Sequence, residues 1–260
     1  MSPDVLVRPG ECHVWTARAV SVSPGLEALL DAAERRVFAS FLREPDRALY
    51  LTAHALRRLV LAEALDRDPA ALVFAAGPHG KPYVEDAPVE FSLTHSGERV
   101  AVAVTSGTPV GVDVERVTEL AELPLPVLSE RERAVFDRVP EPDRAAAFTS
   151  YWVRKEAVLK ATGEGLRVDP ARLTVSAADR PAELLGWRGR DAARRGGGRR
   201  DDSQRAAEQR EAVQPHPPVR LYDLDAGEGY RGAVALLGPA HRIVRHDGGG
   251  VLHRPRRAAG

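Results

Sequence analysis

Two carboxylates on one strand could hold a metal ion. Asp113 and Glu115 lie in the sequence GVDVER, and strand side chains alternate, so both point to one face and Val112 and Val114 point to the other. Like charges on one face repel each other unless a cation compensates. Mg²⁺ is such a cation, and it commonly binds one or two carboxylates together with substrate phosphates. The alternative is a solvated strand edge with Arg116 nearby.

A helix would supply a third carboxylate and a lysine. In YWVRKEAVLKATGEGL, Trp152, Glu156 and Lys160 are spaced at i, i+4 and i+8, which places them on one helical face, whereas Lys155 points elsewhere. Gly163 can end the helix. A Glu followed four residues later by Lys is also an ordinary stabilising pair, worth about 0.2–0.5 kcal/mol. Together with the carboxylate pair, these residues instead indicate a metal–phosphate site with a cationic clamp.

Two turns carry further residues that could bind phosphate. Lys81 lies in GPHGKP, and Thr94 and His95 lie in FSLTHSG. All three side chains can donate to phosphate oxygens. Taken singly, each segment is better explained by ordinary turn chemistry. The chain has 34 Arg but only three Lys, so each Lys is a candidate for a role that a guanidinium does not serve.

The elements that must position these residues alternate between strands and helices. Strands are expected at 12–22, 71–76, 89–93, 99–105, 110–114, 172–176, 219–224 and 230–237. Helices are expected at 25–42, 46–66, 129–138 and 143–162, with Pro45 starting the second. The two halves share this order, which favours an α+β protein of paired subdomains. The sequence identity between the halves is too weak to prove a repeat.

Composition excludes several classes. The chain has 260 residues, a formal net charge of zero and no long apolar run, which argues against a nucleic-acid or membrane partner. Cys12 is the only cysteine, so neither an intramolecular disulfide nor a cysteine-based zinc cluster is expected. The polar N-terminus does not resemble a signal peptide, and a cytoplasmic protein is expected.

Three familiar motifs do not apply. GEGYRG at 227–232 matches a dinucleotide-binding pattern but has no room for the required βαβ unit. No serine-hydrolase elbow surrounds Ser96, and the histidines lack zinc-protease spacing.

Residues 186–218, rich in Arg and Gly, carry eight Arg against five acidic residues. We interpret them as a disordered insertion rather than an RNA-binding segment, and 248–260 as a flexible tail.

The four segments, in this order, resemble the 4′-phosphopantetheinyl transferases of the large, two-subdomain, surfactin-synthetase-activating (Sfp-like) type. The matching motifs are GKP at 80–82, THS at 94–96, GVDVE at 111–115 and the helix from Trp152 to Lys160. The resemblance covers roughly residues 25–240 and includes all three lysines. One departure is Val37, where members of the family often have a basic residue.

The resemblance implies a fold and a site. The fold is two similar subdomains related by a pseudo-twofold axis, each a small, mostly antiparallel sheet with a long helix. We place the N-terminal subdomain at 1–106 and the C-terminal one at 107–247. The implied site residues are as follows: Mg²⁺ on Asp113, Glu115 and Glu156; coenzyme A on Lys81, Thr94, His95, Asp113 and Lys160; Glu156 and Lys160 as catalytic groups; and Arg47, ahead of Arg35 or Arg36, for the 3′-phosphate.

The implied reaction is Mg²⁺-dependent transfer of 4′-phosphopantetheine from coenzyme A to a serine of an apo acyl or peptidyl carrier protein. The protein would act as a monomer in polyketide, nonribosomal-peptide or fatty-acid synthesis. Two alternatives remain at this point. One is a non-catalytic module that binds coenzyme A or the carrier. The other is a Mg²⁺-dependent phosphohydrolase that uses water as the acceptor.

Overall fold

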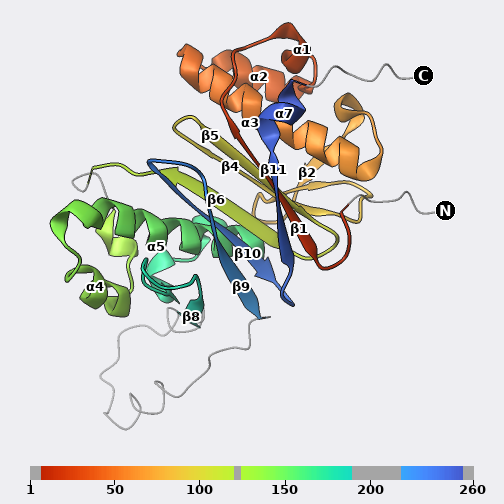
Figure 1. The fold of residues 1–260 in the computed structure, drawn as a ribbon. Helices are drawn as coiled ribbons and strands as arrows, with labels where there is room; N and C mark the ends of the chain where they lie inside the picture. The colour runs from red at the N-terminus through yellow and green to blue at the C-terminus, as the bar shows by residue number, and fades with distance from the viewer. Residues whose placement is uncertain (1–6, 120–123, 189–217, 254–260) are drawn as a thin grey trace, which may run out of the picture.

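Two layers of strands lie between two groups of helices in the computed structural model, which describes residues 7–119, 124–188 and 218–253 (Figure 1). The larger sheet has the strand order β11-β1-β5-β4, and a three-stranded sheet has the order β6-β10-β9. Two short hairpins, β2-β3 and β7-β8, complete the strands.

The elements have the following bounds. The strands are β1 (Glu11–Arg18), β2 (Phe74–Ala76), β3 (Pro82–Val84), β4 (Glu90–Ser96), β5 (Arg99–Thr105), β6 (Val110–Arg116), β7 (Leu173–Val175), β8 (Leu184–Trp187), β9 (Val219–Leu224), β10 (Tyr230–Leu237) and β11 (Arg242–Asp247). The α-helices are α1 (Pro24–Glu27), α2 (Ala32–Ser40), α3 (Glu44–Leu65), α4 (Glu130–Phe136), α5 (Glu141–Thr162) and α7 (Gly248–Leu252). The 3₁₀ turns are η1 (Pro69–Ala71), η3 (Leu125–Val127), η4 (Gly165–Arg167) and η5 (Pro170–Arg172).

The core has three layers of apolar contact. Helix α3 packs its buried face on β5 and its neighbours, and α5 packs on β6 and β10. Between the sheets, Val14 of β1 and Ala103 of β5 lie in one buried cluster with Val112 and Val114 of β6. These two valines face the other sheet, so Asp113 of the same strand faces α5, as the alternation predicts.

The two long helices begin alike. Both α3 and α5 have 22 residues, start with EPDRA and carry proline in the first turn, where its missing N–H costs no hydrogen bond. The predicted helix at 25–42 is instead two helices, α1 and α2. The sequence break is a capping box, in which Asp31 and Glu34 satisfy the first backbone N–H groups of α2.

The C-terminal part of the chain returns to the first sheet. Strand β11 pairs in parallel with β1 (Figure 1), a strand that the sequence analysis did not anticipate. Residues 248–252, predicted above to be part of a flexible tail, form α7. Val251 and Leu252 of this helix are buried in the apolar cluster that also contains the buried face of α3. Within the expected insertion, Gly186 and Trp187 belong to β8, and residues 189–217 lie outside the described residues.

Most other predictions agree with the structure. The strands expected at 99–105, 219–224 and 230–237 coincide with β5, β9 and β10. The mixture of small sheets and helices confirms the α+β class. None of the helices in the described ranges has the length and apolarity needed to cross a membrane.

Candidate active site

Gly111 brings α5 into contact with β6. A Cβ atom added at Gly111 would lie 2.0 Å from the carbonyl oxygen of Ala157 and 2.4 Å from the backbone nitrogen of Ala161. Only a residue without a side chain permits so close an approach of helix and strand. The next positions on this face of β6, Asp113 and Glu115, therefore lie close to the turns of α5 that carry Glu156 and Lys160.

The neighbouring strand β4 supports β6 with a row of hydroxyl groups. Ser92, Thr94 and Ser96 share one side of β4 because strand side chains repeat every two residues. Ser92 Oγ accepts a hydrogen bond from the Val112 backbone N–H (3.1 Å). Thr94 Oγ1 donates to Asp113 Oδ1 (2.9 Å), and Ser96 Oγ donates to Glu115 Oε2 (2.5 Å). Both carboxylates are thereby fixed by strand-borne donors.

Lys160 joins the group from α5. Its Nζ lies 2.6 Å from Asp113 Oδ1 and donates to the Val112 carbonyl oxygen at 3.3 Å. Asp113 is only 2% exposed, and burying its charge without a cation nearby would be costly. The ammonium group of Lys160 supplies that cation in this structure.

Glu156 and Glu115 are both harder to ionise than usual. Burial and the charges of Asp113 and Glu115 together raise the pKa of Glu156 to about 7, against the opposing charge of Lys160. Burial likewise raises the pKa of Glu115, against hydrogen bonds from Ser96 and Trp152. Asp113 contributes to the raised pKa of both glutamates, so the three carboxyl groups form a region of negative potential, which attracts a cation.

The donor chemistry of this cluster fits Mg²⁺. Asp113 Oδ2 and Glu156 Oε1 are buried and have no hydrogen-bond partner among the described residues, and carboxylate oxygens are the ligands that Mg²⁺ prefers. The side chains of the cluster are not arranged as a complete metal-binding site. In the described part of the chain, no three His, Cys, Asp or Glu side chains are grouped so as to hold a metal ion.

The remaining predicted residues surround the cluster without joining it. His95 points to the opposite side of β4 from Thr94; burial lowers its pKa, and the charges of His54 and Lys160 lower it further. Lys81 Nζ donates to Glu90 Oε2 (3.2 Å) and to the carbonyl oxygens of Val110 (3.2 Å) and Ala161 (3.4 Å). The structure thus brings Thr94, Asp113, Glu115, Glu156 and Lys160 together, and places His95 and Lys81 beside them.

Arg47 lies in the first turn of α3, whereas the three carboxylates of the cluster lie on β6 and α5. Its guanidinium carbon is 4.8 Å from the centre of the Phe38 ring. Its Nε is buried with no hydrogen-bond partner in the described ranges. On the same helix, the rings of Tyr50 and His54 stack with centroids 3.9 Å apart. The charge of His54 lowers the pKa of His95 on β4. A strip of side chains therefore runs from Arg47 along α3 toward β4.

The sequence analysis missed two buried ion-pair clusters. Lys155 Nζ lies 2.5 Å from Glu132 Oε2, and in the other half Arg58 binds Glu34 and Asp31. The signals were the capping boxes D-x-x-E and S-x-x-E, which mark Glu34 and Glu132 as helix N3 residues. The expectation that Lys155 points away from Glu156 and Lys160 is confirmed, since it is fully buried against α4.

Comparison with known proteins confirms the resemblance that the motifs suggested. Residues 109–207 match the model of the 4′-phosphopantetheinyl transferase superfamily, and this range contains Asp113, Glu115, Glu156 and Lys160. Over this range the chain is similar to the 4′-phosphopantetheinyl transferases.

Individual relatives point the same way. A putative 4′-phosphopantetheinyl transferase of Synechocystis sp. is 30% identical over 149 residues, which span 55% of this chain and 61% of that protein. The 4′-phosphopantetheinyl transferase gsp of Aneurinibacillus migulanus is 27% identical over 52% of this chain and 56% of its own length. HetI of Nostoc sp. is 27% identical over 63% of this chain and 73% of its own length. The alignments with the first two thus span less than two thirds of those proteins.

A solved structure described as a Chronobacterium ammoniagenes ACPS–CoA complex also aligns, covering 50% of this chain and 96% of that chain at 22% identity. The TM-score is 0.33, and at that value the likeness carries no argument.

Proposed function

We propose that this protein transfers the 4′-phosphopantetheine group from coenzyme A to a serine of an apo carrier protein and releases adenosine 3′,5′-bisphosphate. The observation that carries the proposal is the cluster of Asp113, Glu115, Glu156 and Lys160, which lies within the range matched to the superfamily. The Sfp-like type and a role in polyketide or nonribosomal-peptide synthesis belong to the same proposal.

Mg²⁺ would be held by Asp113, Glu115 and Glu156. When bound, the ion would neutralise charge on the pyrophosphate of coenzyme A as the phosphoryl group is transferred. The buried, unpaired oxygens of Asp113 and Glu156 support this assignment. Lys160, which pairs with Asp113 in this structure, would bind phosphate instead when Asp113 holds the ion. In that position it would stabilise the departing bisphosphate.

Glu156 would act as the general base toward the carrier serine. A base works best when its pKa is close to the ambient pH, and in the metal-free protein the pKa of Glu156 is raised to about 7. The carboxylate would accept the hydroxyl proton as the serine oxygen attacks the β-phosphorus of coenzyme A. The bond from that phosphorus to the bridging oxygen of the pyrophosphate would break, and adenosine 3′,5′-bisphosphate would leave with that oxygen. Thr94, His95 and Lys81 would position the phosphates, and Arg47 would bind the 3′-phosphate.

We further propose two subdomains, at 1–106 and 107–247, related by a pseudo-twofold axis. The supporting observations are the matching strand orders β1-β5-β4 and β6-β10-β9, and the equal lengths of α3 and α5. Each half also places a capping-box helix before its long helix. Strand β11 departs from this symmetry because it belongs to the later part of the chain but pairs with β1.

Intact-protein mass spectrometry tests the proposal. An apo carrier protein incubated with the full chain, coenzyme A and Mg²⁺ should gain one phosphopantetheinyl group, and EDTA should prevent the gain. Coenzyme A binding without modification across fatty-acid, polyketide and peptide carriers would instead favour the non-catalytic module. The fact that no metal centre is already grouped among the described residues makes this comparison necessary. Release of phosphopantetheine without any carrier would identify a phosphohydrolase.

A further inference from the structure

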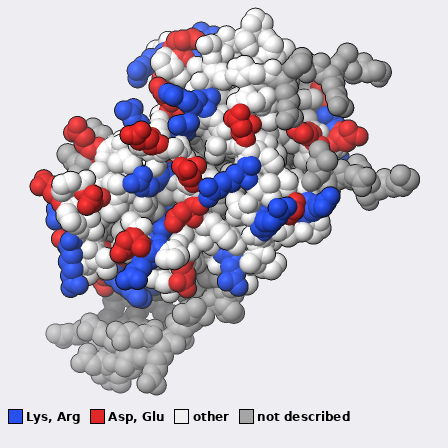
Figure 2. Space-filling model, viewed as in Figure 1, with Lys and Arg blue, Asp and Glu red and all other residues white. Residues whose placement is uncertain are grey.

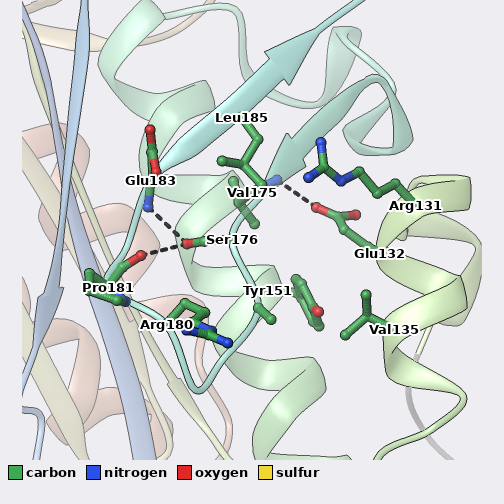
Figure 3. A pocket seen from close by; sticks show the side chains of 11 residues that line it. Arg131, Glu132, Val135, Tyr151, Val175, Ser176, Arg180, Pro181, Glu183 and Leu185 are labelled. Atoms are coloured by element: carbon green, nitrogen blue, oxygen red, sulfur yellow. Dashed lines mark hydrogen bonds between the residues drawn. The ribbon is translucent and has the colours of Figure 1, made fainter.

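A cavity of about 390 Å³ lies between α4, α5 and the β7–β8 hairpin (Figure 3). Its walls are largely apolar and include Val135, Val175 and Leu185, and its polar residues include Tyr151 and two arginines, Arg131 and Arg180. The size is within the range of small-molecule sites. None of the residues assigned above to metal, coenzyme A or catalysis lines it.

Tyr151 places an unused hydrogen-bond donor in this cavity. The residue is 1% exposed, and its side chain extends from α5 toward Val135 on α4 (Figure 3). No described residue forms a hydrogen bond with its hydroxyl group. Burial raises the pKa of Tyr151, and the charge of Glu132 raises it further, so the hydroxyl keeps its proton. The hydroxyl group can therefore donate to an acceptor bound in the cavity.

The charges around the cavity favour an anionic ligand. The charge of Glu132 is balanced by an ion pair, because its Oε2 accepts from Ser129 N (2.7 Å) and pairs with Lys155 Nζ (2.5 Å), and its Oε1 accepts from Val175 N (2.7 Å). The carboxylate of Glu183 points away from Tyr151, whereas the side chain of Arg131 extends from α4 toward the β7–β8 hairpin (Figure 3).

Arg180 adds a second cation at the opening. Its one ion pair within the described residues is a 4.0 Å contact with Asp179, in which both side chains are more than 70% exposed. Such a pair is weak and leaves the guanidinium group available.

We propose that this cavity is a binding site for a small amphipathic carboxylate. The apolar body of the ligand would contact Val135, Val175 and Leu185, and its carboxylate would accept from the Tyr151 hydroxyl and lie near Arg131 or Arg180. The site stands on its own lining and does not rest on the transfer reaction. Because Tyr151 is part of α5, the helix that carries Glu156, a bound ligand would also stabilise that helix against α4.

Octanoate serves as the probe, titrated into the full-length protein by isothermal calorimetry. We expect saturable binding that Val135→Trp abolishes, because the indole would fill the cavity. The matched control is Val37→Trp, since Val37 is 46% exposed on α2 and Val135 is 43% exposed on α4; it should bind octanoate as the parent does. Leu185→Trp fills the cavity from the hairpin side and replaces Val135→Trp if the latter does not fold.

Tyr151→Phe separates the polar contact from the apolar one. It should weaken octanoate binding about tenfold, the value of a hydrogen bond to a charged group, and leave 1-octanol binding within twofold of the parent. No saturable octanoate binding, or equal binding by the parent and a folded cavity-filling variant, would overturn the proposal. Equal octanoate affinity in Tyr151→Phe would overturn the role of the hydroxyl.

Discussion

Arg58 and Lys155 occupy the same position in two helices of equal length. Each follows the first residue of its 22-residue helix by the same number of residues, and each is 0% exposed. Each binds the N3 glutamate of the capping box that starts the preceding helix, Glu34 for Arg58 and Glu132 for Lys155. Each also donates to two backbone carbonyl groups. One buried cation therefore fastens a short helix to a long one in each half.

Replacing Lys155 tests how far the second half depends on this contact. Lys155→Met leaves the buried carboxylate of Glu132 without its cation, and we expect a loss of about 3–5 kcal/mol in the free energy of unfolding, measured with urea. Adding Glu132→Gln should recover part of the loss. The control is Arg133→Met, which breaks an exposed pair with Asp137 and should cost no more than about 0.5 kcal/mol. A similar cost for both single variants would contradict the role assigned to Lys155.

Glu156→Gln should abolish transfer without unfolding the protein. The amide cannot accept the serine proton, and loss of a general base typically lowers the rate by about 10²–10⁴-fold. Mass spectrometry of the carrier measures the rate, and the thermal midpoint reports the fold. Turnover like that of the parent would remove Glu156 from the mechanism.

The raised pKa of Glu156 also predicts a dependence of stability on pH. Between pH 4.5 and about 7 the folded protein retains a proton that the unfolded chain has lost, since the pKa rises from 4.5 to about 7 on folding. Stability from this group is therefore present below pH 4.5 and declines as the pH rises to 7. In metal-free buffer, Glu156→Gln should gain stability relative to the parent between pH 5 and pH 8. Parallel stability curves for the two proteins would show that burial does not perturb this carboxyl.

Gly111→Ala tests the contact that brings β6 to α5. The new methyl group would overlap the carbonyl oxygen of Ala157, and we expect a loss of about 1–3 kcal/mol together with reduced transfer. Gly186→Ala is the control, because nothing lies within 4 Å of the Cβ it would add. Denaturant unfolding of both variants provides the measurement. Equal stability would mean that helix and strand can separate without cost.

Magnesium should stabilise the protein in the presence of coenzyme A. Ligands that bind only the folded state raise the thermal midpoint, so Mg²⁺ should raise it and EDTA should reverse the rise. Asp113→Asn removes a charge that the ion needs and should reduce the Mg²⁺-dependent rise. Thr105→Ser, a change in β5 outside the cluster, should retain the full rise. An undiminished rise in Asp113→Asn would place the metal elsewhere.

Local rules predicted half of the site. Alternation along a strand placed Asp113 and Glu115 on one face, and helical spacing placed Glu156 and Lys160 on another. No local rule could reveal that β4 lies beside β6, because that contact joins segments connected only through the fold. The hydrogen bond from Thr94 to Asp113 therefore appears only in the structure.

The elements show the same division between local and long-range information. Strands β5, β9 and β10 were predicted with correct bounds because turns delimit them. Strand β11 was not, since its stability comes from β1, more than 200 residues earlier in the chain. The apolar spacing at 25–42 predicted a single helix and did not indicate that the Asp31 capping box starts a second helix, α2, within this range.

The pairing of β11 with β1 sets an order for assembly during synthesis. A ribosome makes β1 near the beginning of the chain and β11 near its end, so the first sheet keeps an open edge along β1 until residues 242–247 emerge. An open strand edge invites pairing with other chains. Chains released before residue 242 would lack this strand, and we expect them to associate through β1 even though every predicted catalytic residue is already present.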